Sequence, residues 1–410
     1  MHLKRLALLA LLTACASRDS RLVTATVDTL PGGIVRVTSS APTGWTGTDG
    51  WKLVELPAIQ PAQGSPGELI NPSSIAVDDQ QRLYVADEKP TNIKVFDSTG
   101  TLVRIIGNEG DGPGEFRSAY VAIRGNRLLV HDPRASRTNL FDTSGTFIRS
   151  FHSVGMYFAP VALDAAERAV LPLIFRIGPG QEEAARKRAF FFVRFDSLGT
   201  LLDTVSAPQL TEEHSWVVKQ GDVGIFGVSV PFAPRTITGF GQDSGLVYGA
   251  SSDFTIMRLQ AGRDTTFVMR RAWTPPSIPD SARADTVETM VKNFANQQVD
   301  EISLRNAFHV DDIPKIGPSF SRLVVDDRGN TWALQSLEAD STRFDIFAPD
   351  GSWLGPVVVP EAISPYGPFA IHGGIVYVEA ENEDGFPLVR RWVIRDGRDG
   401  QGGRDGQVEP

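Results

Sequence analysis

Short apolar runs alternate with turn residues along most of the chain, and the same pattern returns at intervals. A Phe-Asp-x-x-Gly segment begins at Phe96, Phe141 and Phe195, and a related segment begins at Phe347. In each copy a strand-like run precedes the turn and another follows it. Asp and Gly favour a tight turn in which glycine takes a positive φ. Each copy therefore predicts a β-hairpin.

A second hairpin pattern lies upstream of the first. Residues 75–85 resemble residues 323–333 in the spacing of their apolar positions, and each stretch has two aspartates at its turn. Two hairpins per period of about 45 residues make a four-stranded unit, and an array of such units is typical of a β-propeller. We predict six blades, over residues 72–107, 119–151, 158–205, about 234–271, 320–359 and 367–394.

The sixth predicted blade lacks a fourth strand. The segment from Trp51 to Leu56 has the alternation of a strand, and we predict that it completes this blade. Closing the ring with strands from both ends of the chain removes an exposed edge. The predicted fold is all-β, a six-bladed β-propeller of four-stranded antiparallel blades that is closed by an N-terminal strand.

Two stretches interrupt the rhythm of the blades, at about residues 206–233 and 272–319. The second stretch has apolar residues at helical spacing and predicts a helical insertion between blades four and five. These residues are Val287, Met290, Val291 and Phe294. The helix is expected either to pack across a propeller face, as a lid or brace, or to bind a partner protein.

The first residues have the features of an export signal. Lys4 and Arg5 precede a short apolar run, Leu6 to Leu12, which is too short to span a bilayer as a mature helix. The residues from Leu12 to Cys15 resemble the lipobox of bacterial lipoproteins, which implies that Cys15 is lipidated and becomes the new N-terminus. The predicted organisation is a signal peptide over 1–14, a lipidated tether over 15–22, a propeller over 23–394 and a disordered polar tail over 395–410.

Cys15 is the only cysteine, so the mature chain forms no internal disulfide. Several acyl chains would hold the protein stably on a membrane. Ala16 follows the cysteine in place of the aspartate that signals retention at the inner membrane in enterobacterial lipoproteins. We therefore expect a lipid-anchored protein of the bacterial cell envelope, at the outer membrane and facing the periplasm or the cell surface.

The pattern resembles that of the NHL-repeat-like six-bladed β-propeller lipoproteins, over roughly residues 50 to 394. The strand, turn, Leu-Tyr-Val and Phe-Asp-x-x-Gly segments carry the resemblance, together with the stretch from Gly110 to Phe116. It implies the propeller fold. The wider superfamily contains binding scaffolds as well as lyases and lactonases, so the resemblance does not specify an activity.

Composition narrows the possible partners. The 410 residues carry a net charge of −9, with 22% charged and 41% hydrophobic residues, which is typical of a globular chain. An acidic chain of this kind is a poor binder of nucleic acid, so no nucleic-acid partner is expected.

The sequence contains no positive signal for catalysis. It lacks the spaced histidine pairs of a local zinc site and the motifs of common nucleophiles, so we predict no catalytic residue, no metal ligand and no cofactor. Paired acids at Asp78 and Asp326 sit at the same hairpin position, which favours turn formation over calcium binding. The glycines from Gly107 to Gly114 precede a strand and no helix, which disfavours a phosphate-binding loop.

A ligand is expected on one face of the ring, where loops between strands two and three and the connections between blades emerge. Arg, Tyr and His side chains predicted on this face would suit an anionic or carbohydrate ligand. The candidates are Arg117, Tyr120, His131, Arg134, Arg235, His309 and Arg322.

Two functions remain open from the sequence. The first is a noncatalytic, membrane-anchored propeller that binds a small molecule, glycan, peptide or partner protein. The alternative is a metal-dependent extracytoplasmic hydrolase or lyase whose site lies in the central channel and is assembled from histidines of different blades.

Overall fold

The structure is a computed structural model. It describes residues 24–45, 50–153, 161–173, 191–206, 210–211, 214–220, 224–240, 245–259, 265–296, 299–338, 341–364 and 366–396. Cys15, the predicted signal peptide, the tether and nearly all of the predicted tail lie outside these residues.

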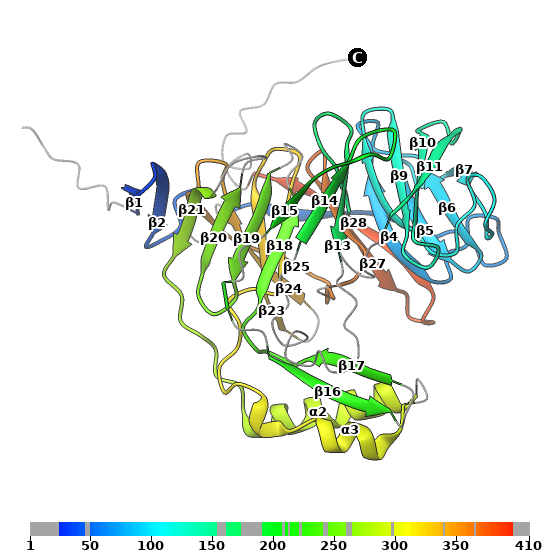
Figure 1. Ribbon diagram of the computed structural model, residues 1–410. Helices are drawn as coiled ribbons and strands as arrows, with labels where there is room; N and C mark the ends of the chain where they lie inside the picture. The colour runs from blue at the N-terminus through cyan, green and yellow to red at the C-terminus, as the bar shows by residue number, and fades with distance from the viewer. Residues whose placement is uncertain are drawn as a thin grey trace, which may run out of the picture.

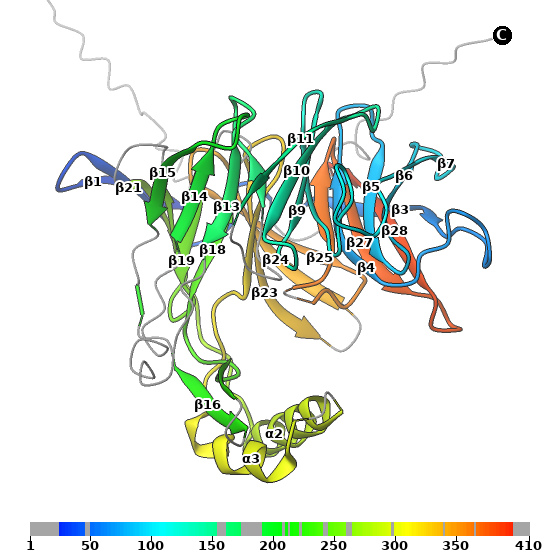
Figure 2. The same ribbon diagram turned by 45° about the vertical axis from the view of Figure 1, so that its right-hand side comes forward.

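Six blades, each made of four antiparallel strands, form a ring, which confirms the predicted six-bladed propeller (Figures 1 and 2). Blade one comprises β4 (Pro72–Val77), β5 (Leu83–Glu88), β6 (Thr91–Phe96) and β7 (Leu102–Ile106). Blade two comprises β8 (Tyr120–Arg124), β9 (Arg127–Asp132), β10 (Arg137–Asp142) and β11 (Phe147–His152). Blade three comprises β12 (Ala162–Leu163), β13 (Ala169–Leu173), β14 (Phe191–Phe195) and β15 (Leu201–Ser206).

The second half of the ring repeats this arrangement. Blade four comprises β18 (Thr236–Phe240), β19 (Leu246–Ala250), β20 (Thr255–Leu259) and β21 (Thr265–Arg271). Blade five comprises β22 (Arg322–Val325), β23 (Thr331–Glu338), β24 (Ser341–Phe347) and β25 (Trp353–Val359). Blade six comprises β26 (Phe369–His372), β27 (Ile375–Glu381) and β28 (Pro387–Arg395), together with β3 (Lys52–Ile59) from the N-terminal part of the chain.

Strand β3 closes the ring, as the sequence predicts. It pairs antiparallel with β28, and Glu55 lies opposite Trp392 in the register. Ile59 at the end of β3 is buried with Tyr377 and Val389 of blade six and with residues of blade one. The last blade is therefore held by strands from both ends of the chain.

The aspartates of the repeats bind the backbone of their own turns. The Asp97 Oδ1 accepts hydrogen bonds from the main-chain N–H groups of Thr99 (2.9 Å) and Thr101 (3.0 Å), and Gly100 has a φ of 90°. The Asp78 Oδ1 likewise accepts from Gln80 N (3.0 Å) and Arg82 N (2.9 Å). These carboxylates act as turn formers, and this is why the pattern recurs from blade to blade.

An additional hairpin extends blade four. Strand β2 (Ile34–Ser39) pairs parallel with β21, and β1 (Ala25–Leu30) pairs antiparallel with β2. This sheet therefore has six strands, and β1 forms its outer edge. The sequence pattern alone did not predict this extension.

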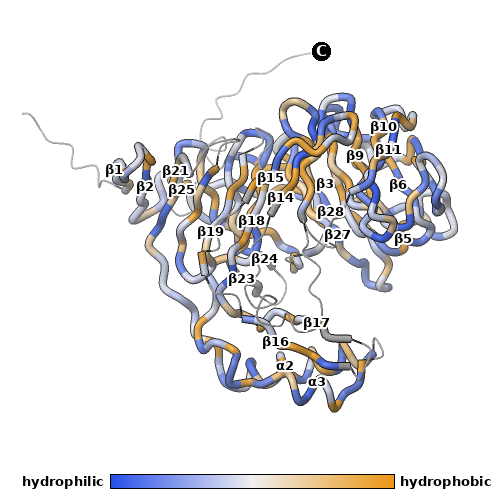
Figure 3. Tube along the Cα trace, viewed as in Figure 1, coloured by the Kyte–Doolittle hydropathy of each residue, from blue (hydrophilic) through white to orange (hydrophobic). Residues whose placement is uncertain are grey.

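The core lies between the blades. Six clusters of buried apolar side chains each join two neighbouring blades around the ring. Apolar segments accordingly follow the strands, while many of the connecting loops are polar (Figure 3). A buried ion pair adds to this packing between blades four and five, where Arg271 Nη2 lies 2.7 Å from Asp345 Oδ2.

The two interruptions of the blade pattern form one subdomain. Strands β16 (Ser215–Gln220) and β17 (Gly224–Ser229) come from the first, and α2 (Asp280–Ala295), α3 (Glu301–Ala307) and the 3-10 helix η2 (Val310–Asp312) come from the second. The Trp216 ring stacks on Phe308 with centroids 4.7 Å apart, and its Nε1 donates to Asp312 Oδ2 at 2.8 Å. The subdomain therefore has a core of its own, outside the ring (Figure 1).

The subdomain marks one face of the propeller. In every blade the loop between the second and third strands and the connection to the next blade open on the same side, which we call the connection face. Both segments of the subdomain are connections between blades, so the subdomain stands on this face (Figures 1 and 2). None of the described helices is long and apolar enough to cross a membrane.

Candidate functional site

Arg322 begins β22, the innermost strand of blade five, at the connection face. Its Nη1 donates to Gly367 O at 2.7 Å, and its guanidinium carbon lies 5.4 Å from the centroid of the Phe369 ring. Desolvation by the surrounding protein lowers the pKa of Arg322 to about 10, although part of the residue stays open to solvent. The side chain is therefore still a cation at neutral pH.

Arg235 lies one residue before β18, the innermost strand of the adjacent blade four. Its main-chain N–H donates to Ser251 Oγ at 2.8 Å, which fixes the backbone, and its Nη1 donates to the hydroxyl of Tyr366 at 2.8 Å. Tyr366 belongs to the connection from blade five to blade six, and it is 54% exposed.

Arg235 and Arg322 therefore bind the same connecting segment. Arg322 contacts the main chain of this segment, and Arg235 contacts its Tyr366 side chain. Among the described residues, no carboxylate lies within ion-pairing distance of either guanidinium. In each arginine only Nη1 makes a hydrogen bond to another described residue, so Nε and Nη2 remain available to a ligand.

Two other candidates, Arg117 and Arg134, already have acidic partners. Arg117 Nε donates to Asp111 Oδ1 at 2.9 Å, and Arg134 Nη2 lies 3.5 Å from Glu88 Oε2. The two arginines lie close together, because Arg134 Nη1 is 3.5 Å from the Arg117 carbonyl oxygen. Their positive charges are therefore largely compensated within the protein.

Tyr120 and His131 face each other on adjacent strands of blade two, and both are buried. His131 Nδ1 lies 3.0 Å from Thr138 Oγ1, whereas Nε2 has no hydrogen-bond partner among the described residues. Burial lowers the pKa of His131 to about 4, so the ring is neutral at pH 7. Neither side chain is therefore exposed on the connection face.

His309 lies away from the other candidates. It precedes η2 in the subdomain and is exposed. The structure thus brings Arg235 and Arg322 together, pairs Arg117 and Arg134 with acids, and leaves His309 on the separate subdomain.

The structure adds Tyr366 and Phe369, which the sequence reasoning missed. Tyr366 lies three residues before β26, and Arg117 lies at the same distance before β8. Aligning the connections between blades at the first strand of the following blade places Tyr366 at the same position as Arg117, and this would have identified it. In the described ranges of the chain, no group of three His, Cys, Asp or Glu side chains is arranged to hold a metal ion.

Comparison with known proteins supports the fold. A family model described as a 6-bladed beta-propeller matches residues 67–121. Among curated proteins, none matches the sequence of this chain. The likeness to solved structures extends over most of the chain at low identity.

A member of the duf4221 family from Bacteroides vulgatus is 12% identical, covers 85% of this chain and 100% of its own, and has a TM-score of 0.52. A Bacteroides fragilis protein is 12% identical, with coverages of 88% and 99% and a TM-score of 0.49. Virginiamycin B lyase from Staphylococcus aureus is 11% identical, with coverages of 84% and 99% and a TM-score of 0.38. At 12% identity, the likeness to the Bacteroides vulgatus protein shows the fold alone.

Proposed function

We propose that this protein is a noncatalytic, lipid-anchored propeller of the bacterial cell envelope that binds an anionic group at Arg235, Arg322 and Tyr366. The observation that carries the proposal is a pair of arginines at the start of the innermost strands of blades four and five, neither of which has a carboxylate partner among the described residues. The surrounding protein desolvates Arg322. A desolvated cation without a counter-ion is unfavourable, and a bound anion would relieve this cost.

The chemistry of the side chains indicates the class of ligand. A guanidinium uses Nε and Nη2 as a planar fork that matches a carboxylate or a phosphate. The exposed ring and hydroxyl of Tyr366 add a surface for stacking and a polar group beside the arginines. A small carboxylate, a phosphate ester or an acidic sugar fits this arrangement.

The site is tested by titrating purified protein with citrate, inorganic phosphate and galacturonate at low ionic strength, using calorimetry and thermal shift. The double variant Arg235→Gln with Arg322→Gln should weaken binding at least tenfold, because charge-assisted hydrogen bonds contribute about 1.5 to 3 kcal/mol each.

The matched control is the double variant Arg117→Gln with Arg134→Gln, which removes the same net charge from the same face. Because these arginines already pair with Asp111 and Glu88, it should bind the anion about as well as the parent. Equal weakening in both double variants would show a diffuse charge effect, and absence of binding to the parent would refute the anionic site.

A further inference from the structure

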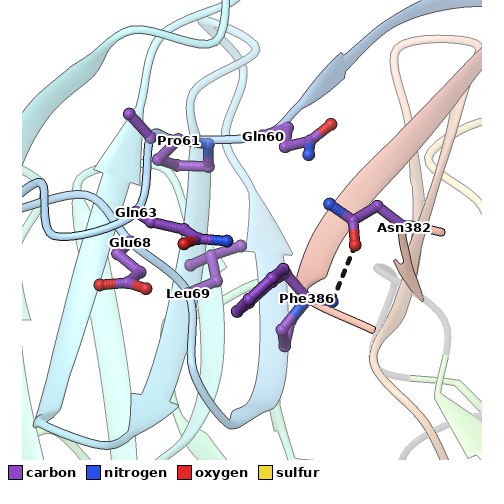
Figure 4. A pocket seen from close by; sticks show the side chains of 9 residues that line it. Gln60, Pro61, Gln63, Glu68, Leu69, Asn382 and Phe386 are labelled. Carbon is purple, nitrogen blue, oxygen red and sulfur yellow. Dashed lines mark hydrogen bonds between the residues drawn. The ribbon is translucent and has the colours of Figure 1, made fainter. Parts of the chain in front are cut away.

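A small pocket lies on the connection face between blades six and one (Figure 4), and no arginine lines it. Its volume is about 160 Å³. One wall is the connection from β3 to β4, which contributes Gln60, Gln63 and Leu69. The opposite wall is the hairpin between β27 and β28, which contributes Asn382 and Phe386.

The pocket combines one aromatic ring with several carboxamides. The Phe386 residue is 38% exposed and extends toward Leu69, which is buried (Figure 4). Gln60 and Gln63 are exposed, and neither side chain makes a hydrogen bond to another described residue. Glu68 supplies the one carboxylate, whose Oε2 accepts from Gly64 N at 2.8 Å.

Both walls are held by hydrogen bonds of their own turns. Asn382 Oδ1 accepts from the main-chain N–H groups of Asp384 (3.0 Å) and Phe386 (2.9 Å), which fixes the amide, and its Nδ2 makes no hydrogen bond to another described residue. On the opposite wall, Glu68 N donates to Ser65 O at 3.1 Å. The pocket is therefore built before a ligand arrives, which lowers the entropic cost of binding.

From this arrangement we infer that the pocket binds a single neutral sugar ring. Carboxamides donate to and accept from hydroxyl groups, and the apolar C–H face of a pyranose can pack on the Phe386 ring. The volume is close to the roughly 150 Å³ of a cavity that holds benzene, so it suits one six-membered ring. Glu68 and the absence of a cation from the lining disfavour an anionic ligand here.

This inference is independent of the arginine site, since the two share no residue. It is tested by ligand-observed NMR with the methyl glycosides of glucose, galactose, mannose and N-acetylglucosamine. We expect at least one glycoside to bind in the millimolar range, which is ordinary for a small ligand with few contacts.

Phe386→Ala should weaken that binding at least tenfold, because the stacking surface is lost. The matched control is Phe232→Ala, which removes an equally exposed ring (40%) elsewhere and should leave sugar binding unchanged. Gln63→Ala, at an exposed position that carries no core packing, should weaken binding even if Phe386→Ala disturbs the hairpin. Circular dichroism verifies the fold of each variant.

Failure of all four glycosides to bind would overturn the inference. So would unchanged affinity in both Phe386→Ala and Gln63→Ala, or binding of an N-acetyl dipeptide amide in the pocket in place of every sugar. The double variant Arg235→Gln with Arg322→Gln leaves this pocket intact. Loss of anion binding at the arginine site and loss of sugar binding in the pocket are therefore separate results.

Discussion

At the residue scale, His131 is a buried titratable group whose Nδ1 lies beside the hydroxyls of Thr138 and Ser153. Its ring is completely buried, and Nε2 has no hydrogen-bond partner among the described residues. Desolvation disfavours the charged ring and lowers its pKa to about 4, from an ordinary value of 6.5. The folded protein therefore keeps this histidine neutral at a pH where the unfolded chain would protonate it.

This difference predicts a loss of stability in mild acid. As the pH falls through 6.5, the unfolded chain gains a proton that the folded protein does not take up until about pH 4, so unfolding becomes easier. Between about pH 7 and about pH 5, His131 should contribute a loss of about 2 kcal/mol in the free energy of unfolding. Urea unfolding at the two pH values measures it.

The variant His131→Gln should reduce this pH dependence, because glutamine does not titrate. His309→Gln, which replaces an exposed histidine of the subdomain, is the matched control and should keep the dependence of the parent. An identical pH dependence in the parent and in His131→Gln would contradict the prediction.

At the scale of elements, β3 differs from the other blade strands in how far along the sequence its partner strand lies. It pairs with β28, more than 300 residues later in the sequence, and places Ile59 in the core between blades six and one. Without β3, blade six would expose the edge of β28. The β1–β2 hairpin also adds strands to a blade, but it only lengthens a sheet that already has four strands of its own.

Deletion of residues 50–57 should therefore destabilise the protein by more than about 4 kcal/mol, or prevent folding, because it opens the ring. Deletion of residues 24–38, which removes most of the β1–β2 hairpin, should lower the free energy of unfolding by clearly less. Thermal and urea unfolding followed by circular dichroism compare the two. Similar losses from both deletions would show that β3 is not required for closure.

At the scale of the whole molecule, the N-terminal hairpin determines where the chain enters the propeller. Ser40 N donates to Thr24 O at 2.8 Å, and Ala272 N donates to Ser39 O at 3.2 Å. Thr24 therefore lies at the same end of this sheet as the last residue of β21, which is the end at the connection face. The nine Cα–Cα steps from Cys15 to Thr24 span at most about 32 Å. A lipid on Cys15 would thus keep this face near the membrane.

The anchor itself is a prediction that labelling can test. Cells that express the parent with a clickable fatty acid should show labelled protein in the membrane fraction. Cys15→Ser should lose the label and become soluble or remain unprocessed, whereas Ser17→Ala, two residues away, should keep it. Label that persists in Cys15→Ser would rule out acylation at this position.

Local sequence patterns were sufficient to predict the number of blades and the strand that closes the ring. A hairpin depends on residues close together in the chain, so Asp97 and Gly100 encode the same turn wherever the segment occurs. The alternation around Val54 likewise indicated a strand without a partner, and blade six lacked one. Repetition made these local signals unambiguous.

Side-chain pairing across blades was decided only by the tertiary structure. Arg134 and Arg322 look alike in the sequence, but folding places Glu88 of blade one beside Arg134 and the carbonyl oxygen of Gly367 beside Arg322. Trp216 and Phe308 likewise meet in one subdomain although they belong to separate interruptions. The sequence by itself therefore determined the repeated hairpins, because these form between neighbours. The tertiary structure determined which charges remain uncompensated, because that depends on residues that only folding brings together.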